Sequence, residues 1–139
     1  MSLVPRCMYC EAHDGGLVAV AEVASGSGPG WSYYACRRCR IAQRLVPLVA
    51  QASNSWGGLH YWPESVPHEL VERLADLGDA PQLRPITDRL FPATAVAASR
   101  AVDDRERDIA VASARAAVAS LWATVTSQPD GLAPAPGGS

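Results

Sequence analysis

The sequence predicts an α+β fold in which a small cysteine-containing module precedes a mainly α-helical region. Two Cys-x-x-Cys pairs flank runs of β-branched and aromatic residues that are typical of strands. Beyond residue 64, apolar residues recur at helical spacing and alanine supplies much of the apolar composition. The length of 139 residues allows one ordinary domain, or a small module with a helical appendage, and excludes a TIM barrel or a two-domain dehydrogenase.

Two strands are expected between the cysteine pairs. Segment 17–23 follows a Gly-containing turn and is rich in β-branched residues, and segment 31–35 is aromatic and runs directly into Cys36. The Gly- and Ser-rich segment 25–30 between them is expected to be a loop. The stretch between Cys10 and Cys36 therefore suits one β-hairpin.

Segment 37–46 predicts a short helix, because apolar residues recur there at i, i+4 and i+8. Pro47 lacks the N–H that a continuing helix needs, so it should end or kink this helix. Segment 51–64 is punctuated by Ser, Asn and Gly, and we expect it to be a linker. It would connect a cysteine module over residues 5–50 to a helical region over residues 65–127.

Residues 65–77 predict an amphipathic helix. Ser65 is the expected N-cap, Pro67 lies in the first turn, and Gly78 is the expected stop. The apolar residues that share one face of this helix are Val66, Leu70, Leu74 and Leu77.

Prolines limit segment 79–92 to one short helical turn around residues 88–91, and one long helix is expected over 93–127. On one side of the long helix lie Ile109, Ala112, Ala116 and Ala119, and nearly opposite lie Val111, Val118 and Val125. A helix that is apolar all round predicts burial against a second copy or another protein, and the alternative is that alanine is simply tolerated on an exposed helix. Residues 128–139 are expected to be a disordered tail.

Charge and targeting patterns bear on partners and compartment. The formal net charge is −2, every basic residue is Arg, and residues 1–52 carry five arginines against three acidic residues. An acidic chain is poorly suited to bind nucleic acid through bulk electrostatics. The first residues lack the pattern of a signal peptide, and the weakly charged segment 109–128 is a weak membrane candidate. We therefore expect a cytoplasmic protein without a membrane partner.

In a reducing cytoplasm, two Cys-x-x-Cys pairs indicate metal ligands rather than disulfides. A hairpin that brings Cys7 and Cys10 to Cys36 and Cys39 supplies four thiolates to one tetrahedral ion. Zn²⁺ suits that geometry, and a closed site with four cysteines leaves no position for water, so the site is expected to be structural. The alternative is a set of buried or redox-active cysteines.

The cysteine module resembles a treble-clef or zinc-ribbon finger over residues 5–50. The residues that carry the resemblance are the first pair at 7–10, the Gly-containing hairpin, and the second pair within 34–39 with its following helix. The resemblance implies that all four cysteines are zinc ligands, and these folds serve in ribosomal, transcription-associated and protein-adaptor proteins. Rubredoxin-like iron sites also use two such pairs, so an iron electron-transfer protein is an alternative, although the expected Gly and Pro residues around the cysteines are absent.

Arg37, Arg38, Arg40 and Arg44 place positive charge beside the second cysteine pair. In one interpretation they contact phosphates, with the aromatic residues of segment 31–35 available for stacking, in a nucleic-acid-binding, transcription-associated regulator. In the other they support the metal site, because guanidinium groups offset the charge of a zinc tetrathiolate and donate to its sulfurs.

No enzyme is expected from this sequence. His13 lies three residues beyond Cys10 and could replace a cysteine ligand, but four cysteines already complete the shell. No Cys-His or Ser-His-Asp spacing surrounds His60 or His68, and the chain has no phosphate loop, nucleotide fingerprint or HExxH motif. The leading hypothesis is a small zinc-binding protein that acts as a protein-interaction adaptor or regulator. Its partner, another protein or a second copy, would bind through the 109–125 helix.

Overall fold

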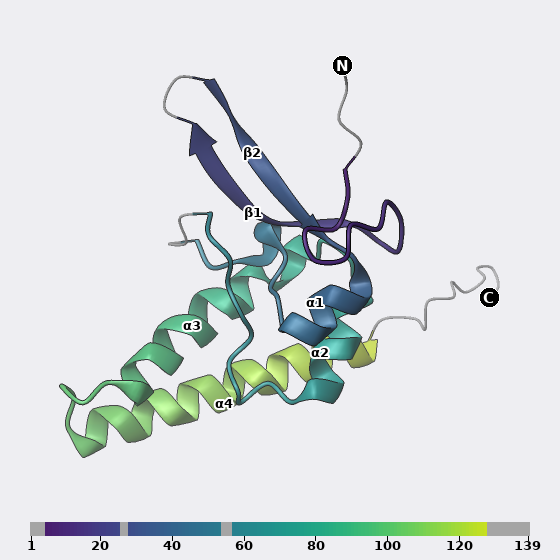
Figure 1. Cartoon of the computed structure of the whole chain (residues 1–139). Helices are drawn as coiled ribbons and strands as arrows, with labels where there is room; N and C mark the ends of the chain where they lie inside the picture. The colour runs from purple at the N-terminus through teal and green to yellow at the C-terminus, as the bar shows by residue number, and fades with distance from the viewer. Residues whose placement is uncertain (1–4, 26–27, 54–56, 128–139) are drawn as a thin grey trace.

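The computed structural model describes residues 5–25, 28–53 and 57–127. In chain order its elements are β1 (Val18–Ser25), β2 (Gly28–Ala35), α1 (Arg37–Gln43), the 3₁₀ turn η1 (Leu48–Ala50), α2 (His68–Ala75), η2 (Pro81–Leu83), α3 (Arg84–Ala98) and α4 (Asp104–Ser127). One antiparallel hairpin is followed by four α-helices, so the predicted α+β class is confirmed (Figure 1). The predicted tail at 128–139 lies outside the described residues.

β1 and β2 pair as an antiparallel ladder that brings Val18 opposite Ala35 and Val23 opposite Trp31. The end of the hairpin near the cysteines is buried, whereas Val23 and Trp31 toward its tip are exposed. The expected loop over 25–30 is wrong at both edges, because the ladder continues to a Ser25–Gly28 pair and only residues 26–27 lie outside the described structure. Glycine disfavours strands, but the pairing with β1 tolerates it here.

α1 is shorter than the expected helix over 37–46. It ends at Gln43 because Arg44 turns into the left-handed region at φ 58°, with its N–H bonded back to Arg40 and Ile41 carbonyls. The helix therefore ends before Pro47, and its end does not depend on the proline. The turn directs Leu45 and Val46 into buried positions.

α2 begins later than the sequence pattern suggested. Pro67 occupies the cap position and Ser65 is exposed in a preceding turn, so the predicted Ser65 cap is wrong. The predicted apolar face is correct, since Val66, Leu70 and Leu74 are buried and Leu77 packs against them. Gly78 follows the helix with φ +72°, a conformation that glycine adopts without a steric penalty.

α3 contradicts the expectation of a proline-broken segment. The helix runs without interruption from Arg84 to Ala98 with Pro92 inside it. Proline removes one backbone hydrogen bond and strains the preceding turn, which costs about 3 kcal/mol in an isolated helix. Here Leu90 is completely buried and Ala93 largely so, and their packing on either side of Pro92 offsets that cost.

The expected single helix over 93–127 is two helices that form an antiparallel pair (Figure 1). The chain turns between Ala98 and Asp104, where the Asp103 carboxylate accepts the N–H of Glu106 at 2.8 Å and so caps α4. The Arg107 guanidinium donates to the Ser99 and Val102 carbonyls and fixes the turn. The Asp103 and Arg107 side chains thus build the reversal between α3 and α4.

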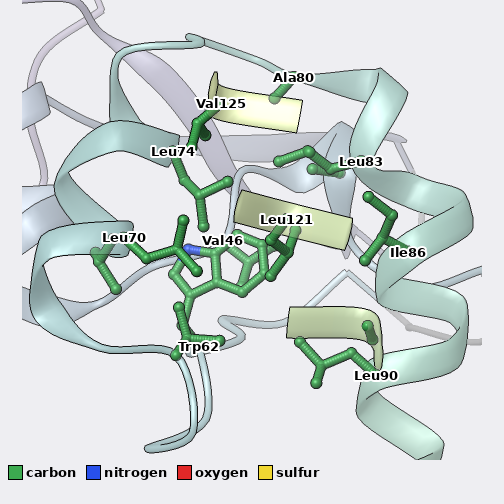
Figure 2. Packing of buried hydrophobic residues seen from close by; sticks show 14 of the residues in the cluster. Val46, Trp62, Leu70, Leu74, Ala80, Leu83, Ile86, Leu90, Leu121 and Val125 are labelled. Atoms are coloured by element: carbon green, nitrogen blue, oxygen red, sulfur yellow. The ribbon is translucent and has the colours of Figure 1, made fainter. Parts of the chain in front are cut away.

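The main core lies between α2, α3, α4 and the segment that precedes α2. Figure 2 shows Trp62 at its centre, with Leu70 and Leu74 from α2, Leu83 and Leu90 from the η2–α3 side, and Leu121 from α4. A smaller core beneath the hairpin contains Cys7, Val20, Ala35, Cys36 and Leu45. Leu45 and Val46 are adjacent in sequence but belong to different cores, so the chain joins the two at this point.

α4 packs through one face only. The buried positions of α4 are Ala110, Ala114, Ala117, Leu121 and Val125. The side that carries Ile109, Ala112, Ala116 and Ala119 is exposed in the single chain, and Ile109 is 61% exposed. The expectation of burial all round is therefore not met within one chain.

Candidate metal centre

The first cysteine pair is shaped by a tight backbone turn docked on β2. The N–H of Cys7 bonds to the Ala12 carbonyl at 2.8 Å, and the N–H of Glu11 bonds back to the Cys7 carbonyl at 2.9 Å. Glu11 adopts φ 62°, which reverses the chain after the second cysteine of the pair. The N–H of Met8 donates to the Tyr34 carbonyl, so the turn is held against the strand that leads to the second pair.

The second pair lies at the start of α1. Cys36 is the N-cap residue and Cys39 lies in the first turn of the helix, so helical geometry points both side chains back toward the first pair. The loop before β1 closes the site, because the Gly15 carbonyl accepts the N–H of Arg37 at 2.9 Å. Gly15 adopts φ +87°, which explains glycine at this position.

The four sulfur atoms of Cys7, Cys10, Cys36 and Cys39 lie within 4.8 Å of one another. Zn–S bonds of about 2.3 Å arranged tetrahedrally require sulfur–sulfur distances of about 3.8 Å. The Sγ atoms of Cys10 and Cys36 are 3.8 Å apart, so this pair already has the spacing of a tetrahedral site. The donor set and its geometry therefore fit a Zn²⁺ ion.

The protonation of the sulfurs also suits a cation. Burial would raise the pKa of Cys7, but backbone N–H donors, among them that of Tyr9, stabilise its thiolate and lower the pKa to about 6. Burial and hydrogen bonds to the other sulfurs raise the pKa of Cys39 to about 12. One sulfur carries negative charge readily while another retains its proton, because four thiolates repel one another without a cation between them. A divalent ion would displace the remaining protons and neutralise half of the resulting charge.

Arg40 is a buried structural residue, with 3% of its surface exposed. Its guanidinium donates to the carbonyls of Ala35 at 3.2 Å, Ala75 at 3.1 Å and Gly16 at 2.8 Å. These carbonyls belong to the end of β2, the end of α2 and the loop beside the metal site. Burial lowers the pKa of Arg40, and the charges of Cys36 and Asp79 act in the opposite direction. Arg40 thus links the cysteine module to α2.

Two of the other three arginines are also engaged with the protein. Arg44 donates to the carbonyls of Trp62, Pro63 and Val66, which fixes the chain ahead of α2. Arg37 pairs with Asp76 at 2.5 Å, and this hydrogen bond raises the pKa of Arg37.

Arg38 is exposed and forms no hydrogen bond or ion pair with any other described residue. The structure thus leaves one of the four predicted arginines unengaged. Most of the groups that bind the other three arginine side chains lie on distant segments of the chain. The neighbouring sequence therefore does not identify them.

None of the histidines belongs to the sulfur cluster. His13 is exposed, the His60 Nδ1 lies 2.9 Å from the Gly58 carbonyl oxygen, and His68 faces Glu72 at 3.4 Å. Trp62, two residues after His60, is buried, and its ring packs at a tilt against that of Phe91.

Sequence reasoning missed two buried polar residues that support the module. The Gln51 amide donates to the Val20 carbonyl at 3.1 Å and to the Gly58 carbonyl at 3.2 Å. It thus joins β1 to the segment between η1 and α2. The Thr87 hydroxyl donates to the Ala50 carbonyl at 2.7 Å, which joins α3 to η1. A single Gln or Thr in an apolar stretch carries no local pattern that would reveal such a role.

Comparisons with protein-family models, with curated proteins and with solved structures return no match for this chain. The geometry of the cysteine cluster and its surroundings therefore carries the functional conclusion by itself.

Proposed function

We propose that this chain is a zinc-binding protein in which Cys7, Cys10, Cys36 and Cys39 hold one structural Zn²⁺ ion. The observation that carries the proposal is the convergence of the four sulfurs within 4.8 Å beside a two-stranded hairpin. The second pair at the N-terminus of α1 favours a treble-clef finger over a zinc ribbon, in which a further strand would follow.

The ion would cross-link three parts of the chain, namely the first cysteine turn, the end of β2 and the start of α1. Four cysteine ligands complete a tetrahedral shell and leave no open position for a substrate or water. We therefore propose a stabilising and not a catalytic role, in a protein that is not an enzyme and acts in the cytoplasm. The small core beneath the hairpin is too limited to hold the module together without such a link.

The helical region is the part we assign to partner binding, as an adaptor or regulator. Among the described residues, α4 has the length and composition of a membrane span, and 28% of that stretch is buried. Leu121 and Val125 pack into the main core, however, and Arg115 interrupts the apolar stretch. We therefore assign the exposed side of α4, which carries Ile109 and Ala116, to a protein partner or a second copy and not to a membrane.

A second candidate function is nucleic-acid binding, and one observation favours it. Trp31 and Tyr33 are exposed two residues apart on β2, and the exposed Arg38 side chain has no hydrogen-bond or ion-pair partner among the described residues. Exposed aromatic side chains and an unpaired cation suit a single-stranded nucleic acid better than a duplex. This candidate predicts binding that weakens with salt and is reduced by Arg38→Ala. If that variant binds a single strand as the parent does, the arginine has no such role.

Metal analysis of the purified protein tests the main proposal. We expect about one zinc per chain, as a site with four cysteine ligands requires. A preparation containing less than about half a zinc per chain under reducing conditions would contradict the proposal. A coloured protein with one iron would instead support the rubredoxin-like alternative.

Two single-residue variants sharpen the metal test. Cys36→Ser should lose the metal, because it removes one of four ligands. Ser32→Ala, on the exposed side of β2, should keep it. Sedimentation of the zinc-loaded protein with and without Ala116→Glu then tests the α4 surface for self-association.

A further inference from the structure

The four cysteines of the metal centre are not equally accessible. Cys7 and Cys36 are buried and Cys39 is partly buried, whereas Cys10 is exposed. The Sγ of exposed Cys10 lies 3.8 Å from the Sγ of Cys36, which belongs to the other Cys-x-x-Cys pair. The site therefore has one sulfur open to solvent and a second sulfur from another element directly beside it.

A groove of about 650 Å³ leads to these two sulfurs. The cysteines that line it are Cys10 and Cys36, and its walls come from the Gly15–Gly16 loop, the start of α1 and the end of α2. The charged residues that line the groove are Arg37, Arg38, Arg40, Asp14 and Asp76. Arg37 is bound to Asp76, but Arg38 has its guanidinium free of protein partners within the described residues.

We infer that Cys10 and Cys36 form a peroxide-sensitive pair whose oxidation to a disulfide releases the metal. The inference rests on the proposed zinc site, because the metal holds both sulfurs as thiolates. The groove admits a small oxidant such as hydrogen peroxide to these two sulfurs.

The chemistry takes two steps and consumes one hydrogen peroxide. The Cys10 sulfur attacks one peroxide oxygen, the O–O bond breaks, and hydroxide leaves while the sulfur becomes a sulfenic acid. The Cys36 thiolate then attacks the Cys10 sulfur, forms the S–S bond and displaces a second hydroxide. Two thiolates lose two electrons in total, and the peroxide gains them as two hydroxide ions.

The groove favours this pair over a link within either Cys-x-x-Cys turn, because the cysteines that line it are Cys10 and Cys36. A disulfide has an S–S length of about 2.0 Å, so the Sγ atoms of Cys10 and Cys36 must approach by about 1.8 Å. Arg38 can hydrogen-bond to the peroxide and stabilise the departing hydroxide, because guanidinium groups are strong donors to anions. Buried Cys7 is not part of the groove lining and receives no such help.

The disulfide would act on the fold as well as on the metal. Zn²⁺ would keep two of its four ligands, which is too few to retain it in a closed site. Cys36 caps α1, and α1 carries Arg40, whose guanidinium connects the module to α2. Oxidation would therefore loosen the module from the helical region, and reduction would restore it.

The test uses the zinc-loaded full-length protein with hydrogen peroxide and a coloured zinc indicator. We expect one zinc released per disulfide formed. After free thiols are alkylated, combined cleavage after Glu and Arg separates residues 7–11, 23–37 and 39–40. We expect the first of these peptides linked to the second, with fragmentation placing the bond at Cys10. A first-formed bond between Cys7 and Cys10, or between Cys36 and Cys39, would overturn the inference.

Matched variants separate the role of Cys10 from that of a ligand in general. Cys10→His and Cys39→His each keep four metal ligands. Cys10→His should keep its zinc during the time in which the parent protein releases all of it, whereas Cys39→His should still release zinc. Equal resistance, or equal sensitivity, of the two variants would contradict the assignment.

Arg38→Ala should slow the peroxide reaction about threefold, the scale expected for an exposed charge contact. Arg105→Ala removes the same charge from α4, away from the groove, and should leave the rate unchanged. Failure of the zinc proposal itself is recognised separately, because metal analysis precedes oxidation. A protein that holds zinc but resists peroxide contradicts only the inference about Cys10 and Cys36.

Discussion

Replacing Arg40 by Met provides the most direct test of how the cysteine module is attached to the helical region. Met retains much of the aliphatic stem of Arg40 but removes the donors to the carbonyls of Gly16, Ala35 and Ala75. All three carbonyls lose a charged donor, but the Ala75 carbonyl still accepts the N–H of Gly78 at 3.3 Å. The damage should therefore fall on the metal-site loop and on the end of β2.

The magnitude follows from opposing contributions. Each hydrogen bond from a charged donor contributes about 1.5–3 kcal/mol, and a buried carbonyl left unpaired costs about 1–3 kcal/mol. Removing the guanidinium also removes its desolvation penalty of several kcal/mol, which offsets part of that loss. We expect the free energy of unfolding to fall by about 3 kcal/mol, a large share of the 5–15 kcal/mol typical of a domain.

The assay is urea unfolding of the zinc-loaded variant, followed by circular dichroism, with Arg38→Met as the matched control. Arg38 is exposed and unpaired among the described residues, so its replacement should change stability by less than about 0.5 kcal/mol. Arg40→Lys should resemble Arg40→Met, because one ammonium group cannot reproduce the guanidinium fork. Equal stabilities of Arg40→Met and Arg38→Met would refute the assignment of Arg40 as the link.

Three further predictions concern the metal, the core and a close backbone contact. Removing the metal with a chelator should abolish hydrogen-exchange protection of residues 7–46 and spare α3 and α4, because metal binding and folding of such modules are coupled; uniform protection after chelation would contradict this. Leu121→Ala should lower the free energy of unfolding by about 3 kcal/mol, and the control Ile109→Ala by less than about 1 kcal/mol, since Leu121 is fully buried and Ile109 exposed. Gly57→Ala should cost about 2 kcal/mol, because its Cβ would lie 2.7 Å from the Glu22 carbonyl oxygen at φ +90°, and an unchanged thermal midpoint would argue against that contact.

The convergence of the four cysteines could be predicted from sequence because its signal is local. Two residues between cysteines fix a turn geometry, and a hairpin-length insert brings Cys10 to Cys36. The same local reasoning failed at Pro92, where proline predicts a helix end unless tertiary packing outweighs it. Leu90 and Ala93 of α3 supply that packing, because they are buried in the main core together with residues of α4. No residue near Pro92 in the sequence predicts this burial.

The arginine cluster marks the limit of sequence reasoning at the site. Arg37, Arg38 and Arg40 cannot be told apart from sequence, because each is an arginine directly beside Cys36 or Cys39. Their roles differ because the groups they meet come from elsewhere. Arg40 reaches a carbonyl 35 residues away, Arg37 meets a carboxylate 39 residues away, and Arg38 meets neither. Only the fold decides which of these charges is free to act on another molecule.

The distribution of charge around the cysteines connects these roles to function. A zinc tetrathiolate carries a net charge of −2, and burying it requires positive groups or backbone donors nearby. Arg40 is buried close enough to Cys36 for the cysteine charge to influence its pKa, so it supplies part of that compensation inside the protein. The positive charge of Arg37 is balanced by Asp76. Of the four basic residues that suggested a phosphate-binding edge, Arg37, Arg40 and Arg44 thus bind groups of this chain, which leaves exposed Arg38 as the cation to test for phosphate contact.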